Sequence, residues 1–141
     1  MTDRLTGLQW EQKTNDGSIH DVDNGYRWTS LEDFDDTDPD GTVFTEFLST
    51  LNGACFAGRC DWRLPTRDEI ATTFAGPFFG CPADPCIDET LFGPTTTVYW
   101  TSTESALLPS GAWAAGYGTG GLADGGAKNS VILARAVRGG L

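Results

Sequence analysis

An acidic segment in the first third of the chain has the spacing of a calcium-binding loop. Asp36, Asp38 and Asp40 alternate and are followed by Gly41, which gives the pattern D-x-D-x-D-G. In such loops alternate side chains converge on one ion, and the glycine permits the tight turn. We therefore expect these carboxylates, with a carbonyl from Thr42, to hold a Ca²⁺ ion.

The same segment has a simpler interpretation. An apolar pattern typical of a helix begins at Thr42, so Asp40 or Thr42 could cap that helix while the other acids are solvated. The acid that would close a calcium loop is also misplaced, because Glu46 falls one position too early. Both alternatives stay open from the sequence. A melting temperature that is the same in millimolar Ca²⁺ and in EDTA would rule out the calcium site.

Four cysteines fall in two identical C-x4-C spacings, Cys55 to Cys60 and Cys81 to Cys86. They permit three disulfide pairings, and we favour the two local ones because both intervals contain turn-forming residues. Zinc and free thiols are the alternatives. Zinc is less favoured because structural sites usually need C-x2-C spacing or histidines, and the chain has one histidine. Disulfides would place the protein outside the cytoplasm, in the extracellular space or at the cell surface.

The segment CDWRLPTRDEI, residues 60–70, gathers charged and aromatic side chains that could belong to an active site. Thr66 and Glu69 have the spacing of a helix capping box, and Pro65 holds the chain extended before the helix. No nucleophile or base accompanies them in this segment. We therefore interpret it as a structural corner.

Aromatic and basic residues in and beyond this corner are also expected to be structural. Trp62 should point into the core, and Arg63 should pair with Asp61 or with backbone carbonyls. Arg135 and Arg138 lie in the last apolar segment. Each offers a planar fork of donors, which can satisfy several acceptors in an irregular fold.

Motifs typical of enzymes are absent from the sequence. The patterns G-x-S-x-G, H-E-x-x-H and the phosphate-binding loop do not occur. His20 has no second histidine or nearby cysteine with which to bind a metal, so we interpret it as structural or exposed. We expect no enzymatic activity.

Length and charge limit the class of the protein. A chain of 141 residues is consistent with one domain, residues 1–141, that has its own core. The formal net charge of −11 would repel DNA, RNA and other polyanions. No stretch approaches the roughly 18 apolar residues that a membrane span needs. We therefore expect neither nucleic-acid binding nor membrane insertion.

The spacing of apolar residues predicts an α+β fold. One helix should begin near residue 42 and end at residues 52–53, and a second should begin at Thr66. Strands should cover residues 98–103, 112–117 and 131–138, and turn signals at residues 16–17 and 23–25 predict two N-terminal hairpins. The segments 76–97 and 118–130 are rich in glycine or proline and are predicted to be irregular.

Several of these segments together resemble one family. TGLQWEQK, IHDVDNGYRW, GTVFTEFLSTLN, the WRLPT corner, YWTST and the closing RAVR are similar to the Lcl C-terminal domain family in order and spacing. The family is named after the C-terminal domain of a collagen-like bacterial adhesin that binds sulfated glycosaminoglycans and forms trimers. The resemblance implies an extracellular adhesion module that binds a glycan or a protein, at the end of a surface or fibre protein.

The WRLPT corner and the closing R-x-x-R also resemble the formylglycine-generating-enzyme branch of the C-type-lectin-like fold. This resemblance implies two helices packed on small antiparallel sheets with long irregular loops. In those enzymes a C-x4-C pair near the C-terminus binds copper and performs an oxidation, but the C-terminal region here has no cysteine. An oxidase is therefore the least favoured function. A self-assembling subunit of an extracellular filament or coat is the second choice.

The lectin-like resemblance places partner contacts on the loops and strands of the second half of the chain. The residues that we expect to be exposed there and to contact a ligand are Glu104, Tyr117, Asp124, Lys128 and Asn129. Sulfated ligands suit an acidic chain poorly. The expected partners are therefore a neutral glycan, a protein, or further copies of the chain in a trimer or a filament.

Overall fold

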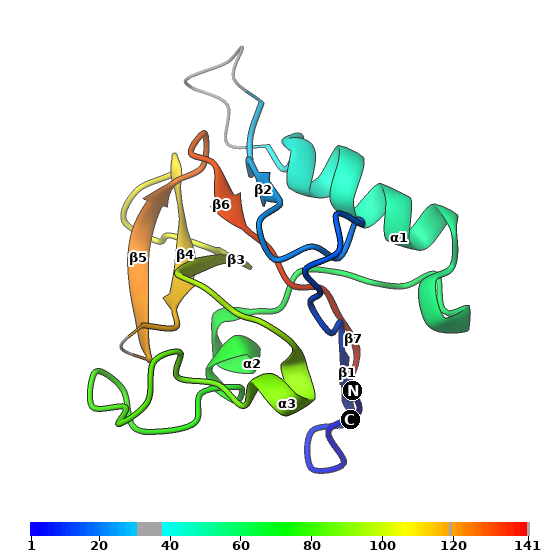
Figure 1. Cartoon of the computed structure of the whole chain (residues 1–141). Helices are drawn as coiled ribbons and strands as arrows, with labels where there is room; N and C mark the ends of the chain where they lie inside the picture. Colours follow the sequence, from blue (N-terminus) through cyan, green and yellow to red (C-terminus); the bar gives the residue numbers. More distant parts are fainter. Residues whose placement is uncertain (31–37, 119, 141) are drawn as a thin grey trace.

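The computed structural model describes residues 1–30, 38–118 and 120–140, and the fold is mixed α+β (Figure 1). The strands are β1 (Leu8–Trp10), β2 (Gly25–Tyr26), β3 (Val98–Glu104), β4 (Gly111–Gly116), β5 (Gly121–Ala127), β6 (Ile132–Leu133) and β7 (Val137–Gly139). The helices are the π-helix η1 (Val43–Leu48), α1 (Ser49–Gly53), the 3-10 helix η2 (Phe56–Gly58), α2 (Arg67–Ala71) and α3 (Glu89–Phe92). Within these ranges no helix has the length and apolar character needed to span a bilayer.

The strands form two sheets, and the smaller one pairs the two ends of the chain with each other. One sheet has the order β2-β6-β3-β4-β5, in which only the β3–β6 pair is parallel. In the other, β1 pairs antiparallel with β7, so the two terminal segments lie side by side (Figure 1). The predicted N-terminal hairpins are therefore wrong, because β1 and β2 pair with C-terminal strands and not with each other.

Three other elements differ from the predicted ones. The segment 118–130 contains β5, where a β-bulge opposite β4 includes Gly125 at a φ of 77°, which glycine tolerates. The last predicted strand is interrupted, because residues 134–136 leave the sheet between β6 and β7. The segment 76–97 contains the short helix α3, which Asp88 caps by accepting the Thr90 amide at 3.0 Å.

The large sheet separates two apolar clusters. Successive residues of a strand point to opposite faces, so Tyr99 and Trp100 of β3 belong to different clusters. The Trp100 cluster includes Val43 and Phe47 from the first helical segment, whose beginning near residue 42 is as predicted. The Tyr99 cluster includes residues from α2 and α3.

The predicted capping box is present at the start of α2. Thr66 Oγ1 accepts the Glu69 amide at 3.2 Å, and Glu69 Oε1 accepts the Thr66 amide at 2.8 Å. Arg63 does not pair with Asp61, as one alternative predicted. Its guanidinium instead donates to both Glu69 carboxylate oxygens, at 2.7 and 2.8 Å, and to two backbone carbonyls. Strand, corner and helix are thus joined through one carboxylate.

Arg138 takes the acid that the sequence assigned to Arg63. Its Nε and one terminal nitrogen donate to the Asp61 carboxylate at 2.6 and 3.1 Å, and the other terminal nitrogen donates to Gln9. Gln9 lies opposite Arg138 in the β1–β7 pair. Trp62 is buried, as alternation predicts, and its Nε1 donates to the Phe56 carbonyl at 3.0 Å.

Replacing Glu69 with glutamine should reduce the sensitivity of the fold to acid. The Arg63 hydrogen bonds hold the pKa of Glu69 below its ordinary value of 4.5. The Glu69 carboxylate is therefore protonated at a higher pH in the unfolded chain than in the folded chain. The stabilisation that the Arg63–Glu69 pair gives the fold is present above pH 4.5 and is lost as the pH falls through the pKa of Glu69 in the folded chain. Urea unfolding at several pH values between about 5 and 3 measures the difference.

The outcome that contradicts this prediction is an equal loss of stability on acidification in the wild type and in Glu69→Gln. Asp68→Asn is the matched control, because Asp68 is in the same helix but its side chain is 91% exposed. It separates the effect of the Arg63 pair from the effect of removing one negative charge.

A fully buried arginine connects three distant segments. Arg135 has no exposed surface and donates to the carbonyls of Glu11 at 3.0 Å and Phe92 at 2.6 Å. Its other terminal nitrogen donates to Thr95 Oγ1 at 2.7 Å. The interruption between β6 and β7 therefore turns this side chain inward, where it satisfies acceptors that no regular element satisfies.

The Glu11 carboxylate is buried beside Arg135 and has three partners. Its Oε1 lies 3.0 Å from Lys13 Nζ and accepts the Ala136 amide at 3.1 Å, while its Oε2 lies 2.6 Å from His20 Nδ1. Burial lowers the pKa of Lys13, and the Glu11 charge opposes that shift. His20 is therefore part of a buried polar network, consistent with a structural histidine.

Candidate functional site

Exposed aromatic side chains gather beside α2, at one end of the large sheet. Phe78 is 58% exposed and Phe79 is 72% exposed, which is unusual for residues of this size. They lie next to Trp113 of β4 around a hollow of about 390 Å³. We call this hollow the aromatic pocket, and its lining residues are Arg67, Asp68, Ala71, Phe78, Phe79, Trp113 and Leu122.

A series of rings connects the aromatic pocket to the core. Phe78 packs edge-to-face on Phe74 at a centroid distance of 5.9 Å, Phe74 on Tyr117 at 5.3 Å, and Tyr117 on Tyr99 at 5.2 Å. This arrangement brings the positive edge of one ring to the negative face of the next. Tyr117 is fully buried, which raises the pKa of its phenol, and its hydroxyl is 2.7 Å from Thr73 Oγ1. The exposed Phe78 ring therefore rests on a fixed base.

A disulfide anchors the same loop. Cys81 and Cys86 are bridged, and the buried Cys86 donates its amide to the Tyr117 carbonyl at 2.6 Å and accepts the Ala75 amide at 3.0 Å. Cys55 and Cys60 are also bridged. The predicted local pairing is thus confirmed, and the zinc and free-thiol alternatives are wrong. Each bridge closes a short loop, which stabilises the fold by about 2 kcal/mol on the chain-entropy model.

Phe79 is held in a backbone conformation that its side chain does not favour. Its φ is 56°, in the left-handed region, which is rare for bulky residues. Its ring lies over Gly121 of β5, where any added Cβ would overlap it. Backbone strain of this kind persists only where the surroundings impose it, and it is concentrated at functional sites. The exposure of Phe79 is therefore imposed by the fold.

Arg67 supplies charge at the edge of the aromatic pocket. Its guanidinium carbon lies 4.5 Å from the centroid of the Trp113 ring, a cation–π contact. Its backbone amide donates to Thr103 Oγ1 at 3.0 Å, which fixes the start of α2 against β3. The Arg67 side chain is 42% exposed and the Asp68 side chain 91%. The pocket thus combines an apolar floor with one cation and one carboxylate at its rim.

The residues expected to contact a ligand lie outside the aromatic pocket. Tyr117 and Lys128 are buried, so the expectation that they are exposed is wrong. Lys128 Nζ donates to Glu104, the last residue of β3, at 2.9 Å and to the Pro109 carbonyl at 2.9 Å, which joins the end of β5 to β3 and to the loop before β4. Asp124 is exposed on β5, and Asn129 is half-buried in the loop that follows.

The sequence interpretation missed Phe78 and Phe79. They lie between Pro77 and Gly80 in a segment with no helical or strand periodicity. Adjacent large apolar residues in such a segment have no regular element to turn them inward. This combination is the signal that could have indicated an exposed apolar site.

The predicted calcium loop is only partly within the described residues, because Asp36 lies outside them. The Asp38 carbonyl accepts the Asp40 amide at 2.9 Å, and the Asp40 carboxylate accepts the amide and hydroxyl of Ser30 at 2.9 and 3.4 Å. Thr42 precedes η1, but its hydroxyl accepts a backbone amide from residue 27 and makes no capping bond.

Thr42 therefore does not cap the first helix through its side chain, so that part of the alternative is wrong. Among residues 1–30, 38–118 and 120–140, no group of three or more histidine, cysteine, aspartate or glutamate side chains could hold a metal ion. The calcium site stays a prediction.

Comparison with known families assigns nearly the whole chain. Residues 1–138 match the family model described as the Lcl C-terminal domain. The search of curated proteins finds no match.

Proposed function

This chain belongs to the Lcl C-terminal domain family, and on that basis we propose that it is a non-catalytic extracellular module whose aromatic pocket binds a protein partner. A glycan is the alternative ligand. In this proposal the domain ends a surface or fibre protein and serves in adhesion. The observation that carries the proposal is the exposure of the adjacent Phe78 and Phe79 rings, with Phe79 held at a positive φ.

Rigid, exposed aromatic residues favour binding over a purely structural role. Contiguous apolar surface is disfavoured on a soluble protein unless a partner covers it. Aromatic and arginine side chains supply most of the binding free energy at protein interfaces. The ring series and the Cys81–Cys86 bridge hold the pocket in one conformation before a partner arrives, which lowers the entropy lost on binding.

The chemistry of the lining favours an apolar side chain of a protein over a sugar. The lining is mostly aromatic and aliphatic, and its charged side chains, Arg67 and Asp68, lie at the rim. The net charge of −11 favours a partner surface that is neutral or basic. Sulfated glycans fit this charge poorly.

We extend the proposal to the fold and the compartment. The paired terminal strands β1 and β7 and the long connection between α2 and β3 support a C-type-lectin-like fold. Two disulfides support an extracellular location, since such bonds persist in oxidising compartments. Both cysteine pairs are bridged, which supports a binding role over a thiol-dependent oxidase.

Selection of ligands followed by substitution in the aromatic pocket tests the proposal. The wild-type domain is screened against a displayed random-peptide library and against a glycan array, and each hit is measured again with Phe79→Ser. We expect peptide hits with apolar side chains whose affinity falls at least about tenfold in the variant. Leu107→Ser is the matched control, because Leu107 is also apolar and 82% exposed but is not part of the pocket.

Peptide hits that keep their affinity in Phe79→Ser would refute the pocket assignment, and hits from the glycan array alone would refute a protein partner. Sedimentation velocity tests whether the protein partner is another copy of the same chain. A wild-type trimer or polymer that becomes a monomer in Phe79→Ser, but not in Leu107→Ser, would assign the pocket to self-assembly.

A further inference from the structure

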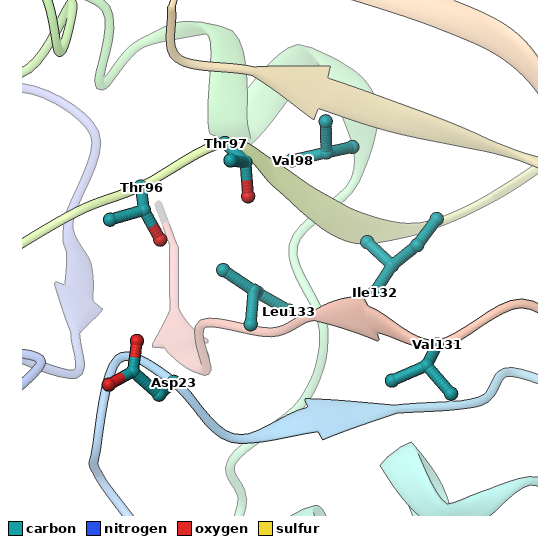
Figure 2. A pocket seen from close by; sticks show the side chains of 7 residues that line it. All are labelled: Asp23, Thr96, Thr97, Val98, Val131, Ile132 and Leu133. Carbon is teal, nitrogen blue, oxygen red and sulfur yellow. The ribbon is translucent and has the colours of Figure 1, made fainter.

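A second hollow lies between β3 and β6 (Figure 2). Residues 96–98 form one wall, residues 131–133 form the other, and Asp23 closes one end. Its volume is about 470 Å³, within the roughly 300–1,000 Å³ typical of small-ligand sites. We call it the strand groove. It shares no lining residue with the aromatic pocket.

Two polar side chains of the strand groove have no hydrogen-bond partner within the described part of the chain, those of Asp23 and Thr97, and both are exposed. Thr96 is also exposed, but it hydrogen-bonds to the Tyr99 hydroxyl. Figure 2 shows both threonine hydroxyls directed from one wall toward the other, with the Asp23 carboxylate at the end. A carboxylate accepts hydrogen bonds, and a hydroxyl both donates and accepts. These side chains can therefore bind a ligand that both donates and accepts hydrogen bonds.

Thr97 has a backbone conformation that favours a functional role for its side chain. Its φ is 37°, although β-branched residues rarely adopt positive φ and glycine would do so freely. Its carbonyl accepts the Tyr117 amide at 2.9 Å, which ties it to the supported end of β4. The hydrogen bond from Tyr117 thus fixes the backbone of Thr97, and the Thr97 hydroxyl points into the groove.

The remaining lining of the groove is aliphatic and shaped by close packing. Val98 is 38% exposed and Val131 is 55% exposed. Val131 lies so close to Gly25 of β2 that a Cβ at residue 25 would clash with its side chain. Glycine at this position therefore allows the apolar wall to form. Branched aliphatic side chains of this kind can pack against the C–H face of a saturated ring such as that of a sugar.

We propose that the strand groove binds a short neutral saccharide, with Asp23 and Thr97 accepting and donating hydrogen bonds to vicinal hydroxyls. An anionic ligand would meet the Asp23 carboxylate and a chain of net charge −11. A divalent cation would need several oxygen ligands, and no cluster of acids among the described residues provides them. This site is independent of the proposed protein partner at the aromatic pocket.

Sugar titration followed by NMR tests the inference. The ¹⁵N-labelled wild type is titrated with glucose, galactose, mannose, N-acetylglucosamine, lactose and maltose, with glucuronate as the charged comparison. We expect amide shifts at residues 96–98 and 131–133 with at least one neutral sugar, with a dissociation constant on the order of 1 mM. Asp23→Asn and Thr97→Val should each weaken that affinity about fivefold or more.

The variants are chosen to keep the fold. Thr97→Val preserves the branched shape and removes the hydroxyl, and the spectrum itself reports whether each variant is folded. Asp84→Asn, which removes an exposed carboxylate outside the groove, should bind as the wild type does. Phe79→Ser should also bind sugar unchanged, which separates this site from the aromatic pocket.

The inference is overturned if none of the neutral sugars shifts these amides, if glucuronate binds as well as its neutral counterpart, or if Asp23→Asn and Thr97→Val retain wild-type affinity. Loss of sugar binding in Phe79→Ser would likewise overturn it, because the ligand would then lie in the aromatic pocket.

Discussion

Replacing Arg135 with methionine should lower the free energy of unfolding by about 3–5 kcal/mol. Methionine fills similar space but cannot donate to the carbonyls of Glu11 and Phe92 or to the Thr95 hydroxyl, which Arg135 reaches at 2.6 to 3.0 Å. These acceptors are buried, so water cannot replace the lost donor. The Phe92 carbonyl keeps the Lys13 amide at 2.9 Å, but the Glu11 carbonyl and the Thr95 hydroxyl oxygen lose the hydrogen bond from Arg135. Removing a buried charge recovers part of its desolvation cost, and we expect the unsatisfied acceptors to outweigh that gain.

Urea unfolding of the oxidised protein measures the effect. Arg135→Lys keeps the charge but loses the fork of donors, and it should fall between methionine and the wild type. Arg4→Met is the control, because Arg4 is exposed, and its change should stay within about 0.5 kcal/mol. If Arg135→Met is as stable as Arg4→Met, the buried arginine does not hold these segments together.

Replacing Glu11 with glutamine should also cost about 3–5 kcal/mol, because it leaves a buried lysine without its counter-charge. Lys13 Nζ lies 3.0 Å from Glu11 Oε1 and 4.6 Å from the centroid of the Phe47 ring. The Nζ has no well-directed hydrogen bond within the described chain, so its stabilisation comes from the ionic contact. Glutamine keeps an acceptor for the Ala136 amide but also changes the 2.6 Å contact with His20 Nδ1, so the loss reports the charge together with that contact.

A double-mutant cycle separates this effect from simple loss of packing. Adding Lys13→Met to Glu11→Gln removes the unpaired charge, and we expect the double variant to be more stable than Glu11→Gln alone. Glu46→Gln, at an exposed acid of η1, controls for the loss of one negative charge from an acidic chain. A double variant whose destabilisation is the sum of the single changes would show that Glu11 and Lys13 are not coupled.

The buried charges and the exposed rings have complementary roles in this fold. Arg135 and Glu11 connect segments that contain little regular structure, where backbone groups would otherwise lack partners. The aromatic pocket depends on that framework, because its rings rest on Tyr117 and Tyr99 above the same core. We therefore expect changes in the polar network to affect stability first, and changes at Phe79 to affect binding with little change in stability.

The partners of the charged residues show the limit of local reasoning. Arg63 has Asp61 two residues away, yet it binds Glu69, because the capping box brings that carboxylate to the strand. Asp61 instead meets Arg138, which β7 brings alongside β1. A side chain reaches whichever acceptor the backbone path presents, and sequence distance does not give that path.

Features set by residues a few positions apart were determined by the sequence. The start of the first helix near residue 42, the Thr66–Glu69 capping box and the local cysteine bridges depend on short-range periodicity, hydrogen bonding and loop closure. The α+β class followed from the same patterns, and the family from the motifs that they form. The sequence is sufficient to predict these features because the interacting groups are close in the chain. They contact each other whatever position their segment takes in the fold.

Only the tertiary structure decided which distant segments meet. It paired β1 with β7 and β2 with β6, made a strand of the glycine-rich segment 121–127, and buried Tyr117 and Lys128. It also brought Phe79 to Trp113 in one pocket and Asp23 to Thr97 in one groove. The physical reason is that strand pairing and burial are decided by competition among all segments for the same core, which apolar spacing within one segment does not encode.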